Sequence, residues 1–117
     1  MKLLIAGSRS ITDFDLSPYV KDDVRLIISG GAAGVDTLAE KYADEKRISK
    51  LIFRPDYKKF GKAAPLVRNR EMVDIADRVL LIWDEVSRGT KFTQNYAAQK
   101  GKELLVITVT QSKGEKG

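Results

Sequence analysis

Residues 24–36 have the sequence VRLIISGGAAGVD, in which an apolar run leads directly into a glycine-rich turn and then into a helical pattern. A second loop, Ser87-Arg88-Gly89-Thr90, has the same setting after the apolar run 78–83. Glycine after a strand lets backbone N–H groups turn toward a ligand, and the helix N-terminus behind the turn carries partial positive charge. The two loops predict a site for a phosphate-bearing molecule, most economically a nucleotide.

Short β-rich runs alternate with helical stretches along the rest of the chain, and most of these runs are continuously apolar, as in strands covered on both faces. The predicted strands are 2–6, 24–29, 50–54, 78–83 and 103–109. Helices are expected over 35–47, after Pro65, and around Phe92 up to a stop at Gly101, whereas 10–22 reads as a short helix or two turns. This alternation predicts an α/β fold: a three-layer, Rossmann-like, doubly wound parallel sheet of about five strands.

Composition limits the chemistry that is available. The 117 residues predict one domain over 1–110, followed by a disordered basic tail over 111–117. The chain has no Cys and no His, which excludes thiolate catalysis, the usual zinc site and the serine-type triad. Any catalysis would therefore use carboxylates, Arg, Lys, Tyr, hydroxyl groups or the backbone, and we expect neither a metal nor a bound cofactor.

The apolar start of the chain is too short for a signal peptide, and no run approaches a membrane span, so we expect a cytoplasmic protein without a membrane partner. The net charge of +5 permits binding of a polyanion but does not demonstrate it.

In a doubly wound sheet, ligands bind beyond the carboxyl ends of the strands. At the first such end, Gly7 allows the chain to turn, Ser8 offers a hydroxyl group, and Arg9 offers a planar cation suited to phosphate. These three residues are candidate ligand contacts, although the triplet taken alone favours a capped turn with a solvated arginine.

The turn of residues 30–34 is a stronger candidate. Gly30, Gly31, Ala32 and Gly34 allow a ligand to approach the backbone, and Asp36 can accept hydrogen bonds at the helix start. The turn lacks the dinucleotide fingerprint, because it reads Gly-Gly-x-x-Gly and no acidic residue ends the following strand. We favour a direct ligand role over a merely tight connection.

The second loop provides Gly89 and Thr90 at a helix start, a plausible phosphate cradle. Ahead of it, Asp84 and Glu85 either bind ribose hydroxyls or cap the loop, and Trp83 either packs in the core or stacks on a base.

Residues 68–70 read Arg-Asn-Arg inside the third helix, where Arg68 and Arg70 lie on different faces, so only one of them can point into the cleft. Asn69 and Arg68 are close enough to the helix start to reach a ligand. The preceding loop mixes lysines with aromatic residues, which suits either nucleic-acid contact or a solvated lid.

Taken in order, these motifs resemble the SLOG superfamily, closest to its small stand-alone proteins related to YspA and YpsA. The resemblance covers Met1 to about Ile107 and rests on Gly7-Ser8-Arg9, Ser29-Gly30-Gly31-Ala32-x-Gly34-Val35-Asp36, Arg68-Asn69-Arg70-x-Met72, Ala76-Asp77 and Gly89-Thr90. It implies a Rossmann-like fold with a nucleotide-type ligand. Relatives in that superfamily include cytokinin-activating phosphoribohydrolases, a DNA-processing protein that binds single strands, and nucleotide sensors.

The resemblance implies phosphate-binding roles for Gly30, Gly31, Gly89 and Thr90, and it places Arg68 where the phosphoribohydrolases keep a catalytic arginine. Their catalytic glutamate has no counterpart, since Thr93 occupies that position here. Relatives often pair, so we also expect a homo-oligomer.

Three hypotheses follow. The first is binding of a nucleotide or nucleotide-derived small molecule, as a sensor or a processing enzyme. The second is hydrolysis of an N-glycosidic bond, in which Arg68 holds phosphate and Asp84 or Glu85 supplies the carboxylate. The third is binding of single-stranded nucleic acid.

Overall fold

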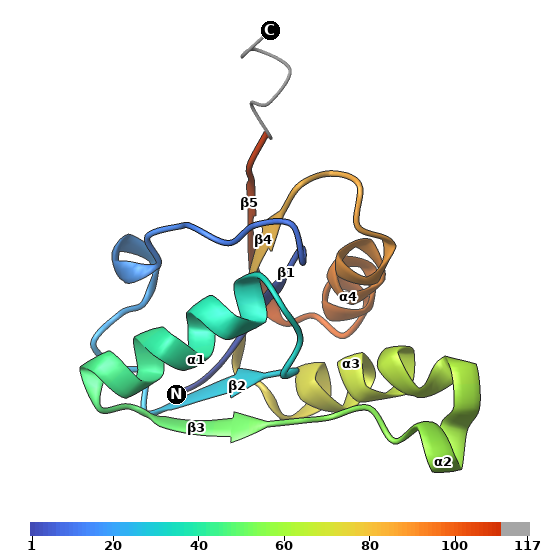
Figure 1. Cartoon of the computed structure of the whole chain (residues 1–117). Coiled ribbons are helices and arrows are strands. Elements are labelled where there is room, and N and C mark those ends of the chain that lie inside the picture. The colour runs from blue at the N-terminus through green and yellow to red at the C-terminus, as the bar shows by residue number, and fades with distance from the viewer. Residues whose placement is uncertain (111–117) are drawn as a thin grey trace, which may run out of the picture.

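A single sheet of five parallel strands, in the order β3-β2-β1-β4-β5, forms the centre of the computed structural model, which describes residues 1–110 (Figure 1). The strands are β1 (Lys2–Gly7), β2 (Leu26–Ser29), β3 (Ser49–Ile52), β4 (Arg78–Trp83) and β5 (Glu103–Thr108). The chain first builds outward from β1 to β3 and then returns to the other side of β1. The strand order therefore reverses between β1 and β4, which pair from Leu3 with Arg78 to Gly7 with Ile82.

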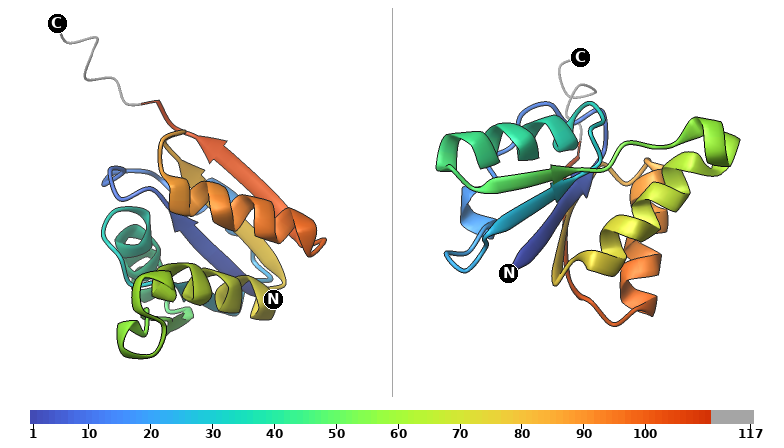
Figure 2. Two further views of the ribbon diagram at one scale, coloured as in Figure 1. Left: turned by 90° about the vertical axis from the view of Figure 1, so that its right-hand side faces the viewer. Right: turned by 90° about the horizontal axis from the view of Figure 1, so that it is seen from below.

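Helices cover both faces of the sheet (Figure 2). Helix α1 (Val35–Lys46) lies on one face, and α3 (Ala64–Ile75) and α4 (Arg88–Gln99) lie together on the other. Shorter elements link them: the 3-10 turns η1 (Ser17–Tyr19) and η2 (Gly61–Ala63), and the four-residue helix α2 (Tyr57–Phe60).

Alternate side chains of the strands build two separate cores. Leu3 and Ile5 of β1 pack toward α1, whereas Leu4 between them packs toward α3 and α4. The same alternation holds in β4, where Leu80 and Leu81 belong to opposite cores. A strand buried on both faces needs apolar residues at successive positions, which explains the continuous apolar runs.

The predicted fold class is confirmed, since the sheet is parallel, five-stranded and covered on both faces. Strand β4 has the predicted bounds, and the other strands differ at their ends by one or two residues. Segment 10–22 contains only the single turn η1. Helix α2 was not predicted; Asp56 caps it by accepting a hydrogen bond from the Lys59 N–H. The expected tail, 111–117, lies outside the described residues.

None of the helices over residues 1–110 is both long and apolar enough to span a membrane.

Replacing Gly7 with alanine tests how tightly the loops pack at the end of β1. An added Cβ would lie 2.1 Å from the Ile82 carbonyl oxygen and 2.8 Å from Val35 Cγ2, so β4 or α1 must shift. We expect Gly7→Ala to lower the free energy of unfolding by about 3 kcal/mol, measured by urea denaturation. The matched control is Gly89→Ala, where nothing lies within 4 Å of the added Cβ and stability should stay level or rise slightly. Equal stabilities of the two variants would contradict the packing described here.

Candidate functional site

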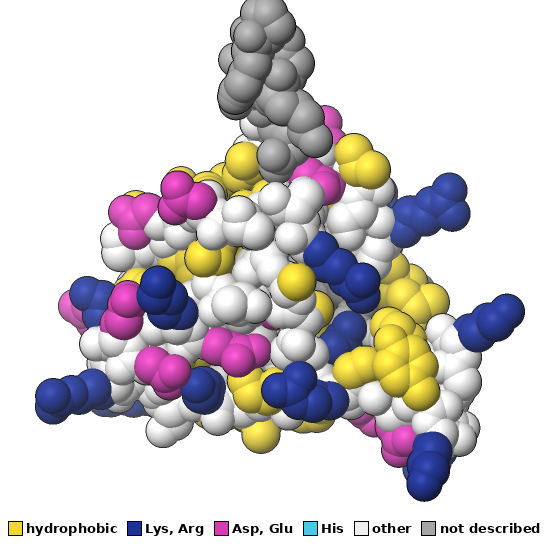
Figure 3. Space-filling view, viewed as in Figure 1, with side chains coloured by type: hydrophobic (Ala, Val, Ile, Leu, Met, Phe, Trp, Pro, Cys, Tyr) yellow, Lys and Arg dark blue, Asp and Glu magenta, His cyan; other side chains and the backbone are white. Residues whose placement is uncertain are grey.

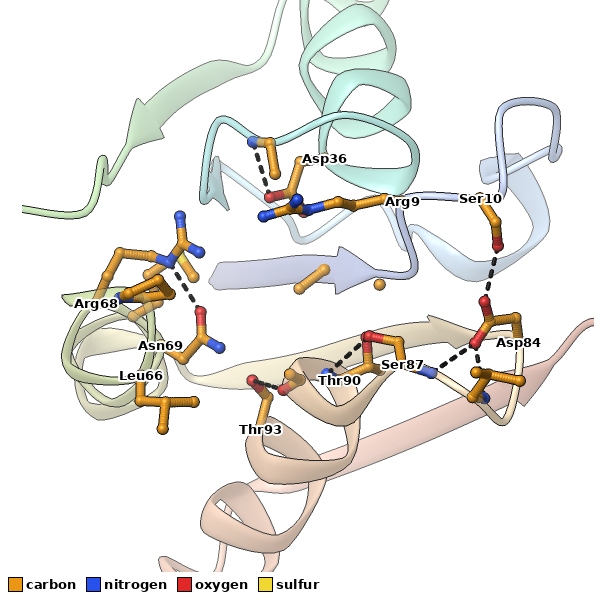
Figure 4. Close-up of a pocket in the computed structure, with 17 residues that line it drawn as sticks. Arg9, Ser10, Asp36, Leu66, Arg68, Asn69, Asp84, Ser87, Thr90 and Thr93 are labelled. Carbon is orange, nitrogen blue, oxygen red and sulfur yellow. Dashed lines mark hydrogen bonds between the residues drawn. The ribbon is translucent and has the colours of Figure 1, made fainter. Parts of the chain in front are cut away.

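A cavity lies where the strand order reverses, at the carboxyl ends of β1 and β4 (Figure 4). Its volume is about 430 Å³, within the range that small-molecule sites usually have. It receives residues from the end of β1, from the loops after β1, β2 and β4, from the start of α1, and from α3 and the N-terminal half of α4. The lining residues are Ala6, Gly7, Arg9, Ser10, Ala32, Asp36, Pro65, Leu66, Arg68, Asn69, Met72, Asp84, Val86, Ser87, Gly89, Thr90 and Thr93.

The N-terminus of α4 forms one wall of this cavity. Ser87 caps the helix, since its hydroxyl accepts a hydrogen bond from the Thr90 N–H and lies 3.1 Å from the Thr90 hydroxyl. The first N–H groups of a helix have no acceptor within the helix. Within residues 1–110, the N–H groups of Arg88 and Gly89 have no acceptor elsewhere either. They leave donors and the positive end of the helix dipole at the cavity wall.

Gly89 differs from the glycines that the packing requires. A Cβ added at Gly34 would lie 2.4 Å from the Ser8 carbonyl oxygen, and Gly34 also has a positive φ of 74°. A Cβ at Gly89 meets nothing within 4 Å, and no unusual backbone angle is needed there. The packing of residues 1–110 therefore gives no reason for glycine at position 89, and its absent side chain leaves the cavity open beside free N–H groups.

The side chain of Arg68 extends from α3 to the loop after β2. It is 8% exposed, and its guanidinium donates to the carbonyl oxygens of Gly30 and Phe53 and to the Asn69 side chain. These bonds use Nε and Nη1, so Nη2 remains available to a ligand. Burial lowers the pKa of Arg68, which Asp36 opposes and the nearby charge of Arg9 reinforces; the guanidinium stays charged at neutral pH.

Asp36 is buried beside this arginine. A Cβ at Gly30 would lie 2.7 Å from Arg68 Nη1 and 2.9 Å from Asp36 Oδ2, so any larger residue would displace one of these charged groups. Oδ2 accepts from the Ala32 N–H at 3.1 Å. Burial raises the pKa of Asp36 and the charge of Glu40 adds to this, while the Ala32 N–H and Arg68 act against them.

Arg9 reaches into the cavity from the loop after β1, and its side chain passes in front of Asp36 in the view of Figure 4. The side chain is exposed and forms no ion pair or hydrogen bond within residues 1–110. It is therefore a free cation at the mouth of a cavity that already contains a helix N-terminus.

Asp84 lines the cavity, but its carboxylate organises the loop that leads into α4. Oδ1 accepts from the N–H groups of Val86 and Ser87, and Oδ2 accepts from the Ser10 hydroxyl at 2.7 Å. Burial alone would raise the pKa of Asp84, but these hydrogen bonds outweigh it and bring the pKa to about 2. The group is ionised near neutral pH and already accepts three hydrogen bonds, two at Oδ1 and one at Oδ2.

Nine of the fifteen predicted site residues line the cavity: Gly7, Arg9, Ala32, Asp36, Arg68, Asn69, Asp84, Gly89 and Thr90. The structure places the remaining six outside it. Ser8 is fully buried and accepts a hydrogen bond from the Asp84 N–H, and Gly30, Gly31 and Gly34 pack against arginine side chains or backbone. Trp83 donates to the Ser87 carbonyl oxygen beneath the loop, and Glu85 is exposed with a positive φ of 69°.

Sequence reasoning did not identify several lining residues as site residues. Thr93 lies one helical turn after Thr90, and its hydroxyl donates to the Gly89 carbonyl oxygen. The three-residue spacing places both threonines on one helix face, so the sequence could have indicated Thr93 as a second lining residue. Leu66 and Met72 read as ordinary core residues of a helix. The sequence around Ser10 does not predict a place in the cavity, because its contact partner Asp84 lies 74 residues away along the chain.

Comparison of the chain with protein-family models, curated proteins and solved structures finds no match. The family resemblance and self-association therefore stay predictions. Among residues 1–110, no group of three or more His, Cys, Asp or Glu side chains could hold a metal ion.

The low pKa of Asp84 predicts a pH-dependent contribution to stability. Because the pKa of the folded state lies below the ordinary value of 3.8, the ionised carboxylate stabilises the fold above about pH 4, and this contribution is lost as the pH falls toward 2. We expect Asp84→Asn to lower the free energy of unfolding by about 1 kcal/mol at pH 7 and by less at pH 2.5. Chemical denaturation at both pH values measures this, with the exposed neighbour Glu85→Gln as the control. A loss that is the same at both pH values would refute this role of Asp84.

Proposed function

We propose that the cavity binds a nucleotide or a nucleotide-derived small molecule, as the ligand site of a sensor or a processing enzyme. The observation that carries this proposal is the N-terminus of α4, where the N–H groups of Arg88 and Gly89 have no acceptor within residues 1–110 and Gly89 lines the cavity without a side chain. Backbone donors at a helix N-terminus are a common way to bind phosphate.

Three further features support the same ligand class. The cavity lies where the strand order reverses, the usual ligand position in doubly wound folds. Arg9 and Arg68 add positive charge that can offset a phosphate. Apolar side chains such as Leu66 and Met72 supply the mixed lining that a base and sugar require.

The hydrolase alternative receives less support. The Asp84 carboxylate already accepts three hydrogen bonds, and Glu85 does not line the cavity, so neither is poised to act on a glycosidic bond. Nucleic-acid binding is also less favoured, because acidic and basic side chains are interspersed on the face seen in Figure 3 and do not form one continuous basic surface.

Thermal unfolding in the presence of nucleotides tests the proposal. We expect at least one of AMP, ADP-ribose, NAD or a cyclic nucleotide to raise the unfolding temperature by several degrees, since a ligand at 100 times its dissociation constant stabilises a protein by about 2.7 kcal/mol. Single-stranded oligonucleotides, measured in parallel, should give a smaller effect that disappears at moderate salt.

A substitution at Gly89 locates the binding. Gly89→Leu should remove the nucleotide-induced shift without lowering the stability of the free protein, because Gly89 lines the cavity and an added Cβ there meets nothing within 4 Å. The matched control is Ala98→Leu, an exposed position near the other end of α4, which should keep the shift. Retained affinity in Gly89→Leu, or a response to none of the small nucleotides, would count against the proposed site.

A further inference from the structure

Asp36 has one carboxylate oxygen that no group in the described protein satisfies. The residue is 5% exposed, and Oδ2 accepts from the Ala32 N–H, but Oδ1 is buried without a hydrogen-bond partner among residues 1–110. The side chain belongs to the lining of the cavity described above. A buried acceptor without a donor costs free energy, so native structures rarely leave one in place without a reason.

The position does not need a second charged oxygen for its local packing. The bond from the Ala32 N–H uses a single acceptor, which an asparagine side chain also provides. The Arg68 guanidinium contributes no hydrogen bond to Asp36, because its recorded bonds go to the carbonyl oxygens of Gly30 and Phe53 and to Asn69. The free protein therefore carries a carboxylate at this point at a cost to its own stability.

Arg9 does not satisfy this oxygen either. It lines the same cavity and crosses the Asp36 carboxylate in the view of Figure 4, yet the two residues form no ion pair within the described structure. Arg9 is exposed and has no hydrogen-bond partner among residues 1–110, so turning it toward a bound phosphate breaks no hydrogen bond. That movement would add a cation to the anion site.

We infer that Asp36 accepts a hydrogen bond from the ligand through Oδ1, so that the ligand joins a phosphate at the N-terminus of α4 to an O–H or N–H donor at Asp36. This inference rests on the proposed function and narrows it. A nucleotide carries such donors on its ribose hydroxyls and, for some bases, on an exocyclic amino group. Inorganic phosphate and pyrophosphate have no O–H or N–H group apart from the phosphate itself. They would therefore contact the N-terminus of α4 but not Asp36.

Asp36→Asn is the direct test, with AMP as the probe. The asparagine oxygen keeps the bond from Ala32 and its amide presents a donor where Oδ1 presented an acceptor. The unfolding temperature of the free Asp36→Asn protein is measured first, to establish that the variant is folded before its affinity is compared. AMP affinity, measured by calorimetry, should fall at least about tenfold.

Glu40→Gln is the matched control. It removes one negative charge from the same helix, one turn further on, and Glu40 does not line the cavity. We expect Glu40→Gln to bind AMP as the unchanged protein does. Equal affinities of the unchanged protein and Asp36→Asn would overturn the inference while leaving the nucleotide proposal intact, and the absence of AMP binding to any variant would overturn the inference for this ligand.

A second measurement needs no variant at Asp36. The unchanged protein is titrated with AMP, 2′-deoxy-AMP, 3′-deoxy-AMP and purine riboside 5′-monophosphate; each of the last three lacks one donor group of AMP and gains none. Weaker binding by at least about tenfold identifies the donor: a deoxy analogue points to a ribose hydroxyl, and purine riboside 5′-monophosphate points to the amino group. If all four ligands bind equally well, Asp36 recognises none of these donors and the inference is wrong.

Discussion

The buried Ser8 joins the three loops on which the candidate site depends. Its N–H donates to the Ile82 carbonyl oxygen of β4, and its own carbonyl oxygen accepts from the Val35 N–H at the start of α1. Its hydroxyl accepts from the Asp84 N–H in the loop that leads to α4. One residue thereby fixes the ends of two strands and the starts of two helices on opposite faces of the sheet. This junction requires close backbone contact, which explains glycine at positions 7 and 34.

The glycines of the two loops have different physical roles. Gly7 and Gly34 allow backbone segments to touch, and Gly30 makes room for the charged groups of Arg68 and Asp36. Gly89 faces open space at a helix N-terminus. Glycine after a strand thus marks a crowded backbone in the loop after β2 and an open cavity wall in the loop after β4. The composition of the two loops looks alike, but only contact with the rest of the molecule separates these roles.

Charge is arranged unevenly around the cavity. Arg68 donates to the carbonyl oxygens of Gly30, directly after β2, and Phe53, directly after β3, while Arg9 is exposed and unpaired within residues 1–110. The two carboxylates also differ: hydrogen bonds satisfy Asp84 and lower its pKa, whereas burial raises the pKa of Asp36 and one of its oxygens lacks a donor. Groups with hydrogen-bond partners thus lie beside groups without them in the lining of one cavity, and the latter are the candidates for ligand contacts.

The amino-acid sequence alone determined the fold class, the strands and the edge of the sheet at which the site lies. Those features depend on local periodicity and on turn residues, such as the apolar run 78–83 and the glycine turn before Val35. Both kinds of pattern involve residues that are neighbours in the sequence, so they can be read without the structure. The roles of individual site residues were decided by tertiary structure. Ser8, Trp83 and Glu85 are plausible ligand contacts by type, yet the first two serve the loops and the third faces solvent. Ser10 meets Asp84 and Arg68 meets Gly30 only because parallel strands bring distant loops to one edge, and no local pattern encodes burial or which polar atom lacks a partner.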